Sequence, residues 1–484
     1  MYTVFPRHDR REGARGYNFL PCDREELFLM PPALQEWLPE GALAWVILDA
    51  VAQMDLTKIE RTYRADGWGQ AAYEPAMMVA LLLYAYCLGE RSGRQIERLC
   101  ERDVAFRVLA ANQRPDHTTI VRFRQTHETA LATLFTQVLT LCAAAGLVKV
   151  GVVALDGTKI KADAALAANR TAETIAAEVT RMLTEAQATD AAEDRLYGPA
   201  QRGDELPETL RDRRSRLARL QACQERLTQE AATATVQQQA KNKARQAEEA
   251  ATGRKKRGRT PKAAEAAADA TAKANVTDPE SRIMKTQGGY VQGYNAQAIV
   301  TEAQIILAAA VTQEENDVRQ LHPMLTEVQE NLQAITTALA DAGYCSETDL
   351  TEADPAGPAL LIATNKDWKQ RQALREQPPP RGRCQKGLTA RDRMERTLLT
   401  TRGRRLYKKR GQTVEPVFGQ IKSTRGCDRF MRRGKAACDS EWKVLCATHN
   451  LLKLWRSGKA AWAGQRRGSG QRRLGRGSGK KTGG

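Results

Sequence analysis

The stretch KVGVVALDGTKI, residues 149–160, decides the fold of the larger part of this chain. Its β-branched apolar residues predict a buried strand, which is expected to end on the carboxylate of Asp156. A second stretch, AITTALADAGY at residues 334–344, has the same pattern and ends on Asp341. Two apolar strands that each end on an acid predict an α/β domain with carboxylates at one edge of its sheet.

Further strands are expected between and after these two stretches. Residues 289–300 and 304–311 alternate as strands and are expected to pair as a hairpin. A helix is predicted over residues 316–331, and ALLIAT at residues 359–364 predicts another strand. Together these elements predict one α/β domain made of residues 149–170 and 285–455.

The N-terminal part, residues 1–148, has the apolar spacing of helices and no strand-like alternation. Ser92, Asp103 and Asp116 each precede a helical run in the position of an N-cap. The helix that starts after Asp116 either acts as a DNA recognition helix or simply presents a solvated face. Its candidate DNA-contacting side chains are Thr118, Thr119, Arg122 and Arg124.

Residues 171–284 interrupt the α/β pattern with a segment rich in Ala, Glu, Gln, Arg and Lys. Leucines at heptad spacing predict a short helical hairpin or a weak coiled coil there. The stretch GRKKRGRTPK, residues 253–262, is either a linker or an arm on DNA, and Arg257 and Arg259 resemble a minor-groove hook. The tail, residues 456–484, predicts a disordered basic segment.

The composition indicates a polyanionic partner. The formal net charge is +18 and the isoelectric point is about 9.6. The longest apolar stretch, residues 77–88, is shorter than the roughly 20 residues that a membrane-spanning helix needs. The N-terminus has no export signal, and the cysteines show no zinc-binding spacing. We therefore expect a cytoplasmic protein that binds nucleic acid, with no role in a membrane.

An isolated acid, Glu415, lies inside a strongly basic segment, YKKRGQTVEPVFGQIK at residues 407–422. An acid on a basic, DNA-facing surface repels the ligand unless a cation binds there. We expect Thr413 to cap a helix with Pro416 in its first turn, so that Glu415 and Lys422 share a face. With Asp156 and Asp341, Glu415 would complete a set of carboxylates suited to Mg²⁺. The alternative is an ordinary surface salt bridge.

At this point the chain resembles the cut-and-paste transposases of bacterial insertion sequences, which have a DDE triad and a Tyr, Arg, Glu, Lys signature around the third acid. The matching stretches cover most of the chain except the helical insertion and the tail. They are YEPAMMVALLLYAY (73–86), RSGRQIERLCERDVAFR (91–107), PDHTTIVRFR (115–124), VALDGTKIKADA (153–164), DPESRIMKTQGGYVQGYNAQAIV (278–300), ADAGYCSE (340–347), VEPVFGQIK (414–422) and THNLLKL (448–454).

The resemblance implies an α/β RNase H-like catalytic domain with an N-terminal all-helical DNA-binding domain and a helical insertion. It implies that Asp156, Asp341 and Glu415 are catalytic and bind two Mg²⁺ ions, which Mn²⁺ can replace. It further implies that Tyr407, Arg410 and Lys422 hold phosphates of the transposon end. Expected partners are double-stranded DNA, as terminal inverted repeats and target, and a second copy of the chain in a synaptic dimer.

Two features depart from the family pattern. Four residues separate Arg410 from Glu415 where the signature has three, and the insertion follows the first acid rather than the second. Trp368 is a candidate for stacking on a flipped base, against the alternative of a packing residue. Two rival functions are a nuclease of the same fold that cuts without joining, and a decayed copy that only occupies DNA as a repressor.

Overall fold

The computed structural model describes residues 36–63, 71–197, 216–255, 263, 271–286, 288–329, 335–353, 357–365, 372, 375–384 and 387–460. The described residues of the N-terminal part are mainly helical, as predicted. Its helices are α1 (Leu43–Val51), α2 (Thr57–Glu60), α3 (Pro75–Cys87), α4 (Gly93–Arg102), α5 (Val104–Leu109), α6 (His117–Thr126) and α7 (Glu128–Ala144).

Two of the three predicted caps form as side-chain hydrogen bonds. Asp103 accepts from the backbone N–H of Phe106, and Asp116 accepts from the N–H groups of Thr118 and Thr119. Ser92 occupies the N-cap position of α4, but its side chain makes no capping bond. The caps therefore fix where α5 and α6 begin.

A mixed sheet forms the centre of the α/β part. Its strands are β1 (Val152–Lys161), β4 (Arg282–Thr286), β5 (Gly289–Thr301), β6 (Ile306–Thr312), β7 (Thr337–Ala340) and β8 (Ala359–Ile362). They lie in the order β4–β5–β1–β7–β8. The remaining strand, β6, also pairs with β5. β1 runs antiparallel to β5 and parallel to β7, which in turn is parallel to β8. The predicted hairpin of β5 and β6 is confirmed.

Three predicted boundaries are wrong. β1 does not end at Asp156 but continues to Lys161, because the long strand β5 pairs with it along that whole length. The helix expected over residues 316–331 is shorter and forms α11 (Leu321–Gln329). β4 begins at Arg282, inside the range given to the insertion, because it pairs with the start of β5.

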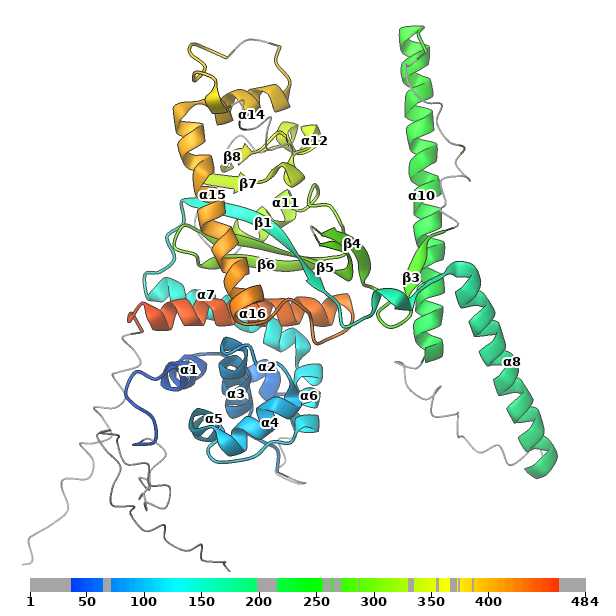
Figure 1. Ribbon diagram of the computed structural model, residues 1–484, viewed down its shortest axis with the longest axis vertical. Coiled ribbons are helices and arrows are strands. Elements are labelled where there is room, and N and C mark those ends of the chain that lie inside the picture. Colours follow the sequence, from blue (N-terminus) through cyan, green and yellow to red (C-terminus); the bar gives the residue numbers. More distant parts are fainter. Residues whose placement is uncertain are drawn as a thin grey trace, which may run out of the picture.

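Helices cover both faces of the sheet (Figure 1). One face packs against α15 (Thr401–Gly419) and α16 (Lys435–Arg456), with the fully buried Trp442 of α16 donating to the carbonyl of Gln297 in β5. The other face packs against α11 through Leu321 and Val328. α7 and α16 lie side by side between the sheet and the helices α1–α6. Near the far end of the sheet lie α12 (Glu347–Thr351) and α14 (Ala390–Leu399).

The insertion consists largely of two helices, α8 (Ala172–Tyr197) and α10 (Arg216–Thr252), which project to one side of the sheet (Figure 1). At their base, Leu220 and Leu227 of α10 pack against Ile175 and Val179 of α8. At these positions the leucines predicted at heptad spacing therefore pack against another helix of the same chain. A short ladder of β2 (Asn169–Thr171) and β3 (Lys273–Asn275) closes the base.

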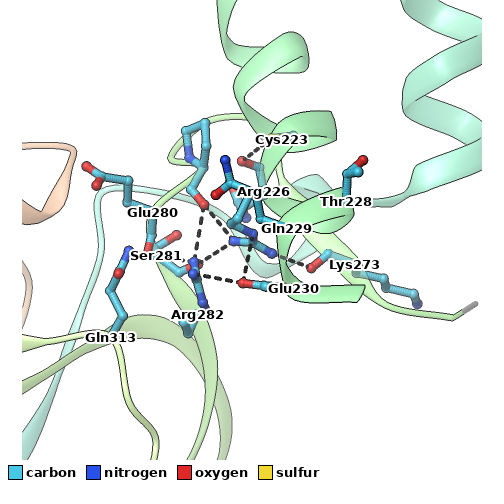
Figure 2. Close-up of polar contacts among 12 residues, drawn as sticks. Cys223, Arg226, Thr228, Gln229, Glu230, Lys273, Glu280, Ser281, Arg282 and Gln313 are labelled. Carbon is cyan, nitrogen blue, oxygen red and sulfur yellow. Dashed lines mark hydrogen bonds and ion pairs between the residues drawn. The ribbon is translucent and has the colours of Figure 1, made fainter. Parts of the chain in front are cut away.

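A network of arginines fastens α10 to the edge of the sheet (Figure 2). The Arg226 guanidinium donates to the backbone carbonyls of Lys273 at 2.8 Å and Ser281 at 3.2 Å. Glu230, one turn further along α10, pairs with Arg282 of β4 at 2.9 Å. These contacts fix the direction in which α10 leaves the sheet.

Candidate functional site

The register between β1 and β7 brings the first two predicted acids together. Val152 pairs with Thr337, and the pairing continues in parallel to Ala154 and Leu339. Two residues further along each chain come Asp156 and Asp341. The two aspartates therefore occupy corresponding positions, just beyond the carboxyl end of β7. Asp341 caps the turn that follows, because its Oδ1 accepts from the N–H of Gly343 at 2.7 Å.

The Asp156 carboxylate faces α15 and is largely buried. Its Oδ2 accepts from the Arg410 guanidinium at 2.8 Å, and only 17% of each side chain is exposed. Burial raises the pKa of Asp156 to about 6; the Arg410 charge acts against this rise, and the nearby Asp341 adds to it.

The third acid lies on a helix different from the one predicted. The helix does not start at Thr413: α15 begins at Thr401, capped by the side chain of Thr400, and runs past Pro416. Pro416 has no N–H to donate to the carbonyl of Gln412, and the side chain of Gln304 donates to that carbonyl instead, at 3.3 Å. Glu415 is exposed and its Oε1 lies 3.6 Å from the same Arg410 that pairs with Asp156.

Beyond Gly419 the helix widens into a π-helical turn, Gln420–Thr424. This turn directs Lys422 onto β1, where its ammonium donates to the hydroxyl of Thr158 at 3.0 Å and to the carbonyl of Lys159 at 3.1 Å. Burial lowers the pKa of Lys422. Tyr407, half-buried, lies one turn before Arg410 on α15. The helix thus sets Arg410, Glu415 and Lys422 along the strand that carries Asp156.

The donor set fits a hard divalent cation in its chemistry, since all three predicted ligands are carboxylates. Asp156 and Asp341 lie at corresponding positions beyond the carboxyl end of β7, and Glu415 lies on α15 near Arg410. Arg410 now lies between Asp156 and Glu415 and pairs with both. Among the described residues, no three His, Cys, Asp or Glu side chains are grouped closely enough to hold a metal ion. Cation binding by all three acids would therefore require their carboxylates to lie closer together than they do here.

Sequence reasoning missed a polar cluster beside this site. Asp317 accepts on Oδ1 from the side chains of Asn295 at 2.6 Å and Gln297 at 2.8 Å, both fully buried in β5. Lys159 lies 3.8 Å from the same oxygen. In the sequence, Asp317 follows Glu314, Glu315 and Asn316 in a polar stretch and looks like a loop residue. The available signal was the run of amide side chains, Gln292, Asn295 and Gln297, in a stretch predicted to be a strand.

The structure divides the predicted DNA-contacting residues of α6. Thr118 and Arg122 are exposed and Thr119 is half-buried. Arg124 does not share their face: it is 8% exposed and donates to the carbonyl of Arg91 at 2.7 Å. Because Arg124 is committed to the interior, the exposed basic residue of this helix is Arg122. Three other predicted contact residues lie outside the described residues, namely Arg257, Arg259 and Trp368.

Comparison with known families follows the same division of the chain. A model described as "Transposase domain (DUF772)" matches residues 32–126, and one described as "Transposase DDE domain" matches residues 259–451. The second match includes Asp341 and Glu415, whereas Asp156 lies between the two. No curated protein and no solved structure matches the chain. No helix in the described ranges is both long and apolar enough to cross a membrane. With two transposase models over more than half of its length, the chain belongs to the insertion-sequence DDE transposases.

Proposed function

We propose that this transposase cleaves DNA at the ends of its insertion sequence and joins the freed ends to target DNA, in a reaction that depends on Mg²⁺ or Mn²⁺. The observation that carries the proposal is the placement of Asp156 and Asp341 at corresponding positions of neighbouring parallel strands, beneath a helix that carries Glu415. Two cations held there would activate the attacking oxygen and stabilise the leaving oxygen.

We further infer that the sheet belongs to the RNase H-like fold. Supporting this, β1, β5 and β6 form an antiparallel meander, and β7 and β8 then extend the other edge of β1 in parallel. The DDE domain match points the same way. In this arrangement the acids of two central strands meet just beyond the carboxyl end of β7, where a DNA backbone would approach.

The basic residues of α15 and its π-turn would position the DNA. Arg410, already paired with Asp156, would transfer to a phosphate of the transposon end when cations neutralise the carboxylates. The Lys422 ammonium contacts β1 at Thr158 and Lys159, two and three residues after Asp156. It would hold an adjoining phosphate. Tyr407 would contribute from the same helix. The exposed face of α6, with Thr118 and Arg122, would contact the duplex away from the cleavage point.

The proposal includes a synaptic dimer, because two ends must be joined in one event, and a cytoplasmic site of action on the nucleoid. It is tested with purified protein, Mg²⁺ and a labelled duplex that carries the element end. Nicking at the boundary and joining to a target duplex are both expected. Asp156→Asn and Glu415→Gln should abolish both, and Glu302→Gln, an exposed acid paired with Lys409, is the matched control.

The outcomes separate the proposal from its rivals. Cleavage without joined product would favour a nuclease of the same fold. Specific binding without cleavage, in either Mg²⁺ or Mn²⁺, would favour a decayed copy acting as a repressor. Cleavage that survives both substitutions would mean that the catalytic acids lie elsewhere.

A further inference from the structure

Two glycines mark the space around Asp317. A Cβ on Gly157, directly after Asp156, would lie 2.7 Å from Asp317 Oδ1 and 2.4 Å from the amide nitrogen of Gln297. A Cβ on Gly343, two residues after Asp341, would lie 2.8 Å from Asp341 Oδ1 and 3.2 Å from Asp317 Oδ2. Asp317 therefore reaches both chain segments that follow the catalytic aspartates, and its Oδ2 borders the same small space as the carboxylate of Asp341.

The two oxygens of Asp317 have different surroundings. Oδ1 accepts from Asn295 and Gln297 and is the oxygen nearer to the Lys159 ammonium, which itself donates to the carbonyl of Glu315 at 2.7 Å. Within the described ranges, no hydrogen bond or ion pair reaches Oδ2. The side chain is thus held by one oxygen while the other stays open toward Asp341, and 20% of the side chain is exposed.

A buried acceptor in the same cluster also lacks a donor. Asn295 is fully buried, and its Oδ1 has no hydrogen-bond partner. This assignment of the amide is fixed, because its nitrogen donates to Asp317 and to the carbonyl of Glu314. Oδ1 lies 2.8 Å from where a Cβ on Gly157 would be, beside Asp317. Buried acceptors in folded proteins are nearly always paired, so this one indicates a ligand or its water that supplies the donor.

We propose that Asp317 is a fourth carboxylate of the cation site, with Oδ2 directed at the cation that Asp341 binds and Oδ1 fixed by Asn295 and Gln297. The inference rests on the proposed function. It assigns Asn295 and Gln297, two of the buried amides of β5, a purpose, which is to hold a carboxylate at a set position despite the cost of burying polar groups in a sheet.

The test measures Mn²⁺ binding to the full chain without DNA, by isothermal titration calorimetry. Asp317→Asn removes the charge and keeps an oxygen that can accept from both amides. It should raise the Kd for Mn²⁺ about 10- to 100-fold. Glu315→Gln, an exposed acid two residues away, is the matched control and should leave the Kd unchanged. Thermal unfolding confirms that each variant is folded. If Asp317→Asn is unstable, Asp317→Ser takes its place, and the same rise in the Kd for Mn²⁺ is expected.

The Asp156→Asn variant distinguishes a failure of this inference from a failure of the proposed function. If Asp156→Asn weakens Mn²⁺ binding and the Asp317 variants bind like the unsubstituted chain, Asp317 is not part of the site and only the present inference fails. If Asp156→Asn also binds normally, the cation site itself is misplaced and the proposed function loses its central support.

Discussion

A buried ion pair between Arg91 and Glu441 joins the N-terminal helices to the α/β part. Arg91 lies between α3 and α4, and Glu441 lies in α16; they are 8% and 2% exposed and 3.1 Å apart. Arg91 also donates to the carbonyls of Gly426 and Arg429, and Glu441 accepts from the N–H of Met431. Arg91→Met keeps most of the side-chain volume and removes the cation paired with the Glu441 carboxylate, leaving Arg124 as a further positive charge nearby.

Breaking one partner of such a pair should cost about 3–5 kcal/mol in the free energy of unfolding, because an uncompensated charge stays buried. The double variant Arg91→Met, Glu441→Leu removes both charges and should recover most of the loss. Burial raises the pKa of Glu441, and loss of Arg91 raises it further. The deficit of the single variant is therefore largest above that raised pKa and shrinks as the pH falls through it.

Urea unfolding, followed by far-UV circular dichroism at pH 8 and pH 5, measures these differences. The single variant should be much less stable than the unsubstituted chain at pH 8, and less so at pH 5. A single variant within about 1 kcal/mol of the unsubstituted chain would refute the reasoning. So would a double variant no more stable than the single one, because the loss would then come from packing and not from the stranded charge.

Three further predictions follow from the same contacts. Arg122→Ala should weaken DNA binding for all sequences and reduce the salt-dependence slope by about one, whereas Arg124→Met should lower stability and leave that slope unchanged. Asn450→Leu removes both hydrogen bonds to the backbone of Ile306 in β6, at 2.9 and 2.8 Å, and should cost at least about 1–3 kcal/mol in urea unfolding. Mn²⁺ affinity should fall as the pH drops through about 6, because protonated Asp156 cannot bind a cation, and Arg410→Met should move that midpoint upward.

The strands and the two aspartates could be predicted because apolar, β-branched runs leave few alternatives to a buried strand. These runs do not show how far a neighbouring strand will pair with them. Asp156 was expected at the tip of β1 and lies in its middle, since β5 continues to pair with β1 as far as Lys161. Asp156 nevertheless lies beside Asp341, because β7 runs parallel to β1 and ends at Ala340, just before Asp341.

The third acid shows where local rules fail. Pro416 and Thr413 together favour a helix start by local rules alone. In the folded chain the carbonyl that Pro416 leaves without its usual donor is reached by Gln304, from the turn between β5 and β6. A contact over more than 100 residues thus allows α15 to continue through the proline. For the same reason, the sequence could not show that Arg124 is buried and Arg122 exposed, because burial depends on what α6 packs against.

The packing of α16 has a consequence for how DNA meets the site. One apolar core includes Leu81 of α3, Phe123 of α6, Trp442 of α16 and Ala298 of β5, so the N-terminal helices and the sheet share a single interior. Arg91 and Glu441 reinforce the same junction with charge. A shared core opposes hinge motion between the two parts, since any rotation would expose apolar surface. If DNA binds along the exposed face of α6, as proposed above, this rigid junction would present it to Asp156 at one orientation.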